Sequence, residues 1–230
     1  MNPAEVARDA VTWLNDPVNW TGPQGVLALT GVHLQMTLIA VLAAAAIALP
    51  LGTWLGHTGR GGGVVVAFSN VTRAMPTYAL LILFSMSPIG RGNPATVIAV
   101  AIFAIPPMLS NAYVGVRGAD ADAKDAARGV GMSPASVLGR VELPLAVPLI
   151  AAGARTSAVQ TIATIPIAAL AGGQNLGTLI TTGFATQNYG KAIAGAILVI
   201  GLCLVCEAVL AVAQRVLTPP PLRLAEAAAA

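Results

Sequence analysis

The charged side chains of this 230-residue chain are concentrated in one short segment. It contains Arg117, Asp120, Asp122, Lys124, Asp125, Arg128, Arg140 and Glu142, out of 12 basic and nine acidic residues in the whole chain. Acidic and basic side chains are suited to ion pairs and hydrogen bonds. No nucleophile–base pair and no set of metal ligands accompanies them in this segment. The chemistry expected of this segment is therefore recognition of another protein rather than catalysis.

The cysteines and histidines are the residues that could bind a metal ion or carry redox chemistry. Cys203 and Cys206 have the spacing of a metal or disulfide pair, but they lie in an apolar run, where cysteine is more often a small hydrophobic residue. His33 and His57 have no further ligand residue at a useful spacing. We therefore expect the chain to bind no metal and no cofactor.

The composition identifies the class of protein that must position these residues. Hydrophobic residues make up 56% of the chain and charged residues 9%, whereas a soluble domain has roughly 25% charged residues. So little charge cannot cover a water-facing surface, and we expect an integral membrane protein with one transmembrane domain. Glu5, Asp9 and Asp16 argue against a cleavable signal peptide at the N-terminus.

Five segments are long and apolar enough to cross a bilayer as helices, for which about 20 residues are needed. They are Leu34–Gly56, Val64–Ile89, Pro94–Val116, Leu145–Leu170 and Ala192–Val212. The sequence therefore predicts an all-α membrane protein with five transmembrane helices. Glu5–Asp16 is expected to form a short interfacial helix, and Ala171–Gly190 to contain a short re-entrant or interfacial helix.

Lysine and arginine residues predict the orientation, because cytoplasmic segments are enriched in them. With the charged segment inside, the cytoplasmic residues are Arg60, Arg117, Lys124, Arg128, Arg140, Arg215 and Arg223, and the outer ones are Arg8, Arg91 and Lys191. The N-terminus is thus expected outside and the C-terminus inside. The predicted organisation is an outer N-terminal segment (1–26), a transmembrane domain (27–217) with cytoplasmic helices at 117–144, and a disordered tail (218–230).

Residues 120–130 are rich in alanine and are expected to form the first of two short helices in the charged segment. Asp120 and Lys124 have the spacing of a favourable helical ion pair. The residues expected to line one side of this helix are Ala123, Ala127 and Val130.

A second short helix is expected over Pro134–Val141. Gly131 can end the first helix in a left-handed conformation, and Ser133 can cap the second with its hydroxyl oxygen. Pro144 and Pro148 are expected to end the second helix before the fourth span. The segment is therefore predicted to be a hairpin of two short helices, which we call the coupling hairpin (residues 117–144).

The spacing in this hairpin resembles the motif Glu-Ala-Ala-x3-Gly-x9-Ile-x-Leu-Pro of the permease subunits of binding-protein-dependent ABC importers. The matching residues are Asp125, Ala126, Ala127, Gly131, Val141, Leu143 and Pro144. Aspartate in place of glutamate and valine in place of isoleucine are mild departures. The resemblance implies the type I importer fold, and it implies that Asp125, Ala126, Ala127, Gly131, Leu143 and Pro144 dock on an ATPase.

Other segments are similar to the osmoprotectant branch of this family, which takes up glycine betaine, carnitine and choline. They are His33–Thr37, Pro50–Gly52, Met75–Leu81, Asn111–Gly115, Gly153–Thr156 and Ala171–Gly177. The resemblance covers about His33 to Arg215. Gln174 and Asn175 stand where two small residues are usual, a departure that bears on the substrate rather than on the family.

The resemblance also implies partners and an energy source. Such permeases work as pairs, with two ATPase subunits in the cytoplasm and an external substrate-binding protein, in the bacterial plasma (inner) membrane. The chain has no Gly-x4-Gly-Lys-Ser/Thr loop, so ATP and Mg²⁺ are expected to bind to the partner ATPase. Closure of the ATPases would move the coupling hairpin and switch the membrane helices between inward-open and outward-open states.

Polar residues inside the spans are candidates for the translocation path. They are Arg73, Asn111, Gln160, Thr161 and Thr164. Hydrogen bonding between helices is the commoner role of the four uncharged residues, and both roles remain open. For Arg73 the alternatives are attraction of a substrate carboxylate, an ion pair with Glu207, or an interfacial position before a second span that starts near Ala74.

Two other transport functions remain open from the residues alone. A permease for another small solute, such as methionine or an alkanesulfonate, would carry the same coupling motif. An ion-coupled secondary transporter would need acidic residues in the spans or duplicated halves, and the spans offer Glu207 and no visible repeat.

Overall fold

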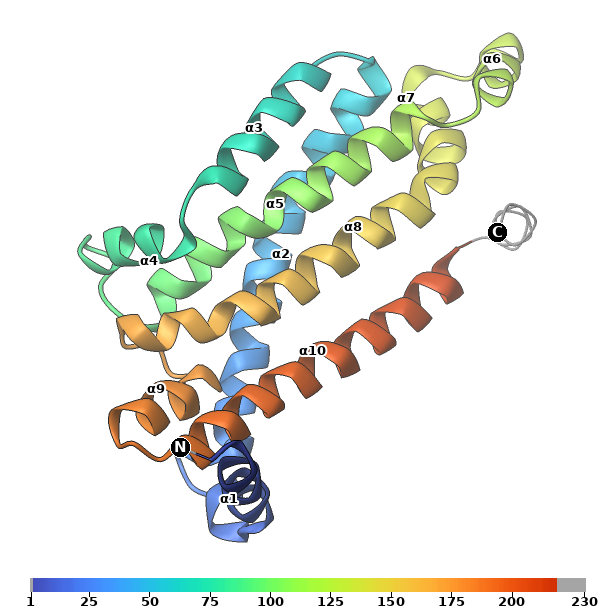
Figure 1. The fold of residues 1–230 in the computed structure, drawn as a ribbon. Helices are drawn as coiled ribbons and strands as arrows, with labels where there is room; N and C mark the ends of the chain where they lie inside the picture. The colour runs from blue at the N-terminus through green and yellow to red at the C-terminus, as the bar shows by residue number, and fades with distance from the viewer. Residues whose placement is uncertain (1, 219–230) are drawn as a thin grey trace. The chain divides into compact units, whose positions relative to one another are not determined.

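The computed structural model describes residues 2–218, and none of these residues is in a strand (Figure 1). Contacts between residues divide the chain into two compact units. Unit 1 comprises Met1–Val41, Met75–Ala101 and Ala158–Cys206, and unit 2 comprises Leu42–Ala74, Ile102–Ser157 and Glu207–Ala230. The long helices α2, α5, α8 and α10 contribute residues to both units. Residues 219–230, which make up nearly all of the predicted disordered tail, lie outside the described part of the chain.

Within residues 2–218, four helical stretches are long and apolar enough to cross a membrane. They are α2 (Val26–Thr58), α5 (Asn93–Arg117), the stretch Pro134–Ala171 that contains α8 (Leu143–Thr164), and α10 (Tyr189–Leu217). They contain the predicted first, third, fourth and fifth spans. The all-α prediction is therefore confirmed for the described residues.

The predicted second span is not one helix. It is divided into α3 (Gly62–Ala74) in unit 2 and α4 (Thr77–Ser85) in unit 1. Pro76 causes the break, because proline has no N–H to donate and disfavours a helical conformation in the residue before it. The count of five spans applies if α3 and α4 together make one crossing.

The N-terminal residues of unit 1 form a short helix, α1 (Pro3–Asn15), as predicted. The Asn2 side chain accepts a hydrogen bond from the Ala4 N–H at 3.1 Å and caps it. A short 3-10 turn, η1 (Pro17–Trp20), follows, and the Trp20 Nε1 donates to the Leu14 carbonyl at 2.7 Å. A β-carbon on Gly190, at the start of α10, would lie 2.7 Å from the Asp9 β-carbon, so α1 packs closely against that turn.

The core of unit 1 brings together residues that are far apart in the sequence. The predicted helix within 171–190 is present as α9 (Gly177–Ala185), which packs between α2 and α10. One cluster consists of Val26, Leu29, Leu176, Leu179 and Val199, and a second of Met36, Ala40, Val100 and Ile165. The second cluster includes the 3-10 segment η3 (Ile165–Ala171), which continues from the end of α8.

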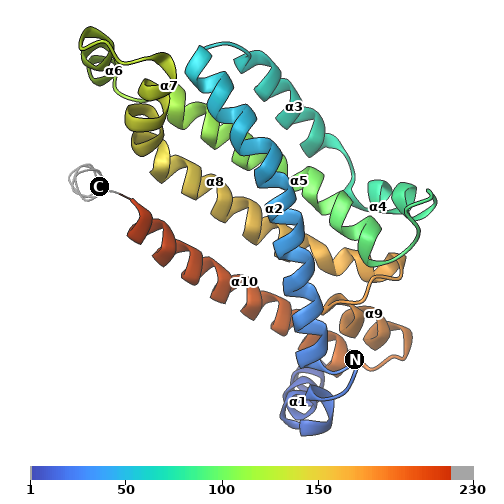
Figure 2. The ribbon, with the colours of Figure 1, turned by 180° about the vertical axis from the view of Figure 1, so that it is seen from behind.

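Close contact between α2 and α5 characterises unit 2. A β-carbon on Gly52 would lie 2.8 Å from both the Leu109 carbonyl oxygen and the Ala112 β-carbon. Helix α3 returns beside the last turns of α2 (Figure 2), and the Ser69 hydroxyl on it is 3.0 Å from the Ser110 hydroxyl on α5. Small residues at such contacts let helices approach closely enough for dispersion attraction to hold them in lipid.

The substitution Gly52→Ala is expected to lower thermal stability in detergent by about 1–3 kcal/mol, the usual cost of overpacking. The reason is that the new methyl group meets the α5 backbone, which cannot rotate away. Gly31→Ala, on the same helix, is the control, because its β-carbon meets nothing within 4 Å and alanine favours a helix. The measurement is thermal unfolding followed by intrinsic tryptophan fluorescence. The unfolding midpoint should be lower than that of wild type in Gly52→Ala and unchanged or higher in Gly31→Ala.

The second hairpin helix does not end at the prolines, so that prediction is wrong. Helix α7 (Pro134–Val137) continues through a π-helical segment, η2 (Leu138–Glu142), directly into α8. The Leu143 N–H bonds to the Leu138 carbonyl, five residues back. This wider turn changes the hydrogen-bond register before Pro144, whose missing N–H would interrupt a regular α-helix.

Candidate functional site

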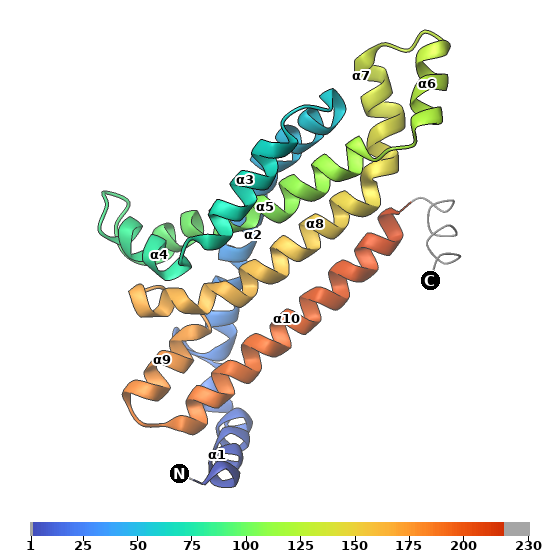
Figure 3. The ribbon, with the colours of Figure 1, turned by 45° about the horizontal axis from the view of Figure 1, so that its top comes forward.

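The coupling hairpin is built on α6 (Ala121–Gly129), which packs against α7 and η2 in unit 2 (Figure 3). The Asp120 side chain accepts from the Ala123 N–H at 2.7 Å and caps the first turn of α6. The Ser133 hydroxyl accepts from the Ser136 N–H at 3.3 Å and caps α7, which begins at Pro134. The predicted cap at Ser133 is confirmed.

Gly131 forms the elbow of the hairpin, with a left-handed φ of 82°. The Gly131 N–H bonds to the Arg128 carbonyl at 2.9 Å, and the Met132 N–H bonds to the Ala127 carbonyl at 3.1 Å. These two bonds are the Schellman pattern that ends a helix at a glycine, so the prediction for Gly131 is confirmed. Apart from Gly131 itself and its two neighbours in the chain, no atom lies within 4 Å of the position of a β-carbon on Gly131, so the elbow is open to an approaching partner.

The charged side chains of α6 pair differently from the prediction. Asp120 is occupied by its capping bond, and the Lys124 ammonium instead donates to the Arg117 carbonyl at 3.2 Å. The ion pair on α6 joins Arg128 to Asp125 at 3.3 Å, with both side chains exposed. The backbone N–H groups of the first turn compete for the aspartate, which is why the spacing rule for Asp120 and Lys124 fails here.

The residues proposed to dock on an ATPase differ in accessibility. Asp125, Ala126 and Gly131 are exposed, whereas Ala127 is 7% exposed and packs inside the hairpin. Val130, which was expected on the same side as Ala127, is 80% exposed. Leu143 is partly buried and Pro144 is exposed at the start of α8. Ala127 is therefore placed to hold the hairpin together, and its neighbours are placed to meet a partner.

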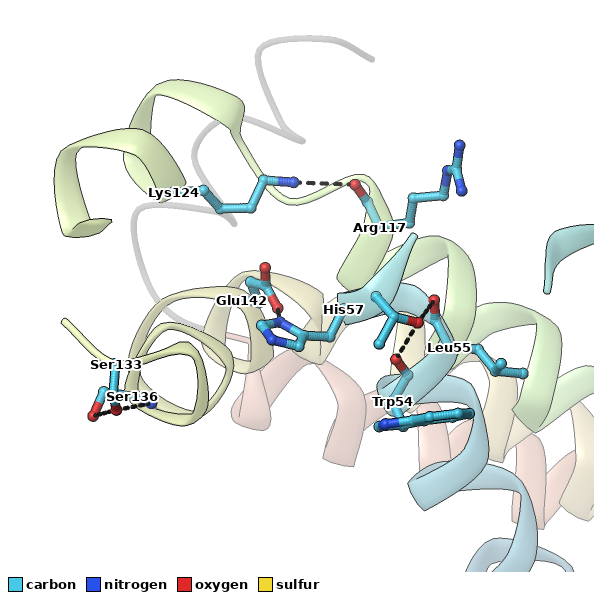
Figure 4. A network of polar contacts seen from close by, with 9 residues as sticks. Trp54, Leu55, His57, Arg117, Lys124, Ser133, Ser136 and Glu142 are labelled. Atoms are coloured by element: carbon cyan, nitrogen blue, oxygen red, sulfur yellow. Dashed lines mark hydrogen bonds and ion pairs between the residues drawn. The ribbon is translucent and has the colours of Figure 1, made fainter. Parts of the chain in front are cut away.

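Sequence reasoning missed a partly buried pair at the base of the hairpin. The His57 Nδ1, in the last turn of α2, lies 2.6 Å from the Glu142 Oε2, in η2 (Figure 4). The Glu142 side chain is 2% exposed and that of His57 18%. The 85 residues between them gave no local pattern that could reveal the pair.

Three of the four uncharged translocation-path candidates make a hydrogen bond within their own helix or are buried. The Asn111 Nδ2 donates to the Pro107 carbonyl at 2.8 Å, and the Thr164 hydroxyl donates to the Gln160 carbonyl at 2.7 Å. Thr161 is buried in unit 1, whereas Gln160 is exposed. The bonds of Asn111 and Thr164 each lie within one helix, so they are not the hydrogen bonds between helices that were the alternative to lining the path, and Gln160 is the exposed member of the set.

The suggested ion pair between Arg73 and Glu207 is wrong. The Glu207 Oε1 lies 3.3 Å from the Arg155 Nε, so α10 is joined to α8 within unit 2. Arg73 is exposed in the last turn of α3, next to the break at Pro76 rather than before the start of a span at Ala74. A charged side chain at a broken helix is expected to face water or a partner.

A second contact that sequence reasoning missed lies in unit 1. The His33 Nε2 is 3.0 Å from the Ile162 carbonyl oxygen, which accepts, so Nε2 carries the proton. The ordinary helical partner of that carbonyl would be the N–H four residues on, but residue 166 is proline and has none. The buried imidazole therefore supplies the donor that the backbone lacks where α8 changes to η3.

The described residues contain no group of three or more His, Cys, Asp or Glu side chains arranged to hold a metal ion. Cys203 and Cys206 are free cysteines on α10.

A family model described as "Binding-protein-dependent transport system inner membrane component" matches residues 26–219. The chain is 36% identical over 194 residues to the choline transport system permease protein OpuBB of Bacillus subtilis, covering 84% of this chain and 89% of that protein. It is 34% identical to the glycine betaine/carnitine/choline permease OpuCB of the same species, over 86% of this chain and 91% of that protein.

Solved structures share the fold. The chain of an inward-facing MetNI methionine ABC transporter matches with a TM-score of 0.73 at 19% identity, over 84% of this chain and 96% of that one. A chain of an amino acid ABC transporter matches with a TM-score of 0.65 at 20% identity, over 83% of this chain and 92% of that one. By its matched length and its relatives, this chain belongs to the family of binding-protein-dependent transport system inner membrane components and is an ABC importer permease.

Proposed function

We propose that the chain is the membrane subunit of an ATP-driven importer for a compatible solute, with glycine betaine, choline and carnitine as the candidate substrates. The supporting observation is the match to the Bacillus subtilis choline permease over 84% of this chain at 36% identity. The methionine and amino acid transporters that share the fold are at most 20% identical, so they bear on the architecture and not on the solute.

In the proposed assembly, two permease subunits span the membrane, with the N-terminus outside and the C-terminus inside. Two ATPase subunits bind ATP and Mg²⁺ in the cytoplasm, and a binding protein delivers the solute from outside. The permease contributes no catalytic residue. Its coupling hairpin docks on the ATPase through Asp125, Ala126 and Gly131, and Leu143 and Pro144 carry the movement into α8.

The hairpin is suited to this role because it is held as one body. Both helices are capped, the elbow has two backbone hydrogen bonds, and α6 packs on α7 and η2. A push on the exposed face of such a body moves the whole hairpin rather than bending it. Small residues at the contact let the ATPase approach the backbone closely.

Solute uptake tests the proposal. The permease would be reconstituted in liposomes with its ATPase and binding protein, and uptake of labelled glycine betaine, choline, carnitine and methionine would be measured with and without ATP. ATP-dependent uptake of one or more quaternary ammonium solutes, and not of methionine, is the expected result. Uptake of methionine alone would replace the proposed substrate, and uptake driven by an ion gradient without ATP would exclude the proposed mechanism.

A further inference from the structure

We propose that the His57–Glu142 pair is a mechanical link that carries the movement of the coupling hairpin into α2. The proposal rests on the function proposed above, since it assumes that an ATPase moves the hairpin. It assigns His57 and Glu142 as positioning residues for transport, whereas the docking residues lie on the exposed face of α6 and at the elbow.

The first argument is the position of Glu142 in the chain. It is the last residue of η2, the π-helical segment on which α6 packs and which leads into α8. A movement of α6 and α7 is therefore passed directly to η2, on which α6 packs. Glu142 moves with that segment, because its backbone is part of it.

The second argument is the mechanical character of η2. A π-helical turn is rare, and it occurs mostly as a single-turn bulge within an α-helix, frequently at functional sites. Pro144 follows immediately and can donate no backbone hydrogen bond. The junction between the hairpin and α8 is therefore the more compliant part of the path, so part of the hairpin movement would be absorbed there unless another contact carried it further.

The third argument is the geometry of the pair. The His57 Nδ1 and the Glu142 Oε2 are 2.6 Å apart, the distance of a short, charge-assisted hydrogen bond. Glu142 is 2% exposed, so its carboxylate has little access to water as an alternative partner. A buried carboxylate is held strongly to its hydrogen-bond donor, and α2 must therefore follow η2 or lose that contact.

The position of His57 determines what the link can move. It lies in the last turn of α2, which continues as one helix from Val26 to Thr58. Helix α2 also packs closely on α5 through Gly52, so a displacement of its cytoplasmic end is passed to a second long helix. In unit 2 the hairpin is thus joined covalently to α5 and α8, and the His57–Glu142 hydrogen bond adds a connection to α2.

The test measures solute transported per ATP hydrolysed in the complete complex reconstituted with its ATPase and binding protein. Labelled glycine betaine and choline serve as the transported probes, and released phosphate measures hydrolysis. In His57→Leu the ratio is expected to fall by roughly tenfold, within the usual range of coupling between sites, while ATP hydrolysis continues. His57→Asn is expected to keep the ratio near that of wild type, because the asparagine amide N–H occupies nearly the place of Nδ1.

Two further variants separate a link from a simple structural contact. His57→Leu/Glu142→Met removes both polar groups and fills the space, so a buried unpaired carboxylate does not destabilise it, and the ratio is still expected to fall. This double variant carries the test if His57→Leu does not accumulate in the membrane. Ser110→Ala, which breaks the 3.0 Å contact with Ser69 between α3 and α5, is the control and should remain coupled.

The outcomes are distinct. A wild-type ratio in the double variant, or an equal loss of coupling in Ser110→Ala, would overturn the link while the proposed function stands. A wild-type complex that takes up neither solute in response to ATP would overturn the proposed function, and the link with it. The link between His57 and Glu142 is supported if coupling is lost in His57→Leu and in the double variant and is retained in His57→Asn.

Discussion

The substitution Gly131→Arg is expected to abolish solute uptake while the protein still inserts in the membrane. Gly131 is exposed at the elbow of the coupling hairpin, where space is open and the backbone has a φ of 82°. Arginine would place a long charged side chain where the ATPase is proposed to approach, and it would strain the left-handed backbone. Disruption of a central interface residue costs about 2 kcal/mol or more, so the affinity for the ATPase should fall roughly 30-fold or more.

Two variants separate the steric effect from the backbone effect. Gly131→Asn keeps a small residue that tolerates the left-handed conformation, and it should retain most of the uptake. Gly22→Arg has the same open space and a φ of 85°, but it lies in the N-terminal segment outside the hairpin, and it should transport normally. The measurement is copurification of the ATPase with each variant. If the ATPase binds Gly131→Arg as well as it binds wild type, the elbow is not part of the docking surface.

The substitution His33→Leu is expected to destabilise the protein by about 1–3 kcal/mol, the cost of leaving a buried hydrogen-bonding group without its partner. The Ile162 carbonyl accepts from His33 at 3.0 Å, and Pro166 cannot serve it. In lipid no water replaces the lost donor. His33→Gln should be tolerated, because the glutamine amide N–H can reach the position of Nε2, whereas His33→Asn is too short to do so.

The physical cause can be isolated with a double-mutant cycle. Pro166→Ala restores an N–H four residues after Ile162, so the backbone itself can serve the carbonyl. His33→Leu should therefore cost less in the Pro166→Ala background than in wild type, by about 1 kcal/mol. Thermal unfolding of the four proteins in detergent gives the coupling energy. If the two changes are simply additive, the carbonyl at Ile162 is not the reason for His33.

The sequence by itself was enough for the helical class, four of the five apolar stretches and the hairpin elbow. An apolar run of about 20 residues is expected to form a helix in lipid, because a helix lets the backbone polar groups form hydrogen bonds within the segment. Gly131 and Ser133 were equally predictable, since caps and turns depend on the few residues around them.

Each prediction that failed concerns a residue that can take part in two alternative hydrogen-bonding arrangements, and the local sequence pattern does not determine which one forms. Pro76 breaks the second predicted span, whereas Pro144 does not end the helix before α8, because a π-helical turn precedes it. Asp120 could form an ion pair with Lys124 or cap α6, and in the structure its side chain accepts a hydrogen bond from the Ala123 N–H and caps the helix. Residue types give the available options, and the surrounding hydrogen bonds decide among them.

The tertiary structure alone decided the pairings between distant residues. Glu207 lies with Arg155, His57 with Glu142, and His33 with the Ile162 carbonyl, across separations of up to 129 residues. Burying a polar group without a hydrogen bond is costly, and the sequence reveals that need but not the partner's identity. Helix packing brings the two side chains within hydrogen-bonding distance, and that packing is set by many apolar contacts at once, so no single motif records it.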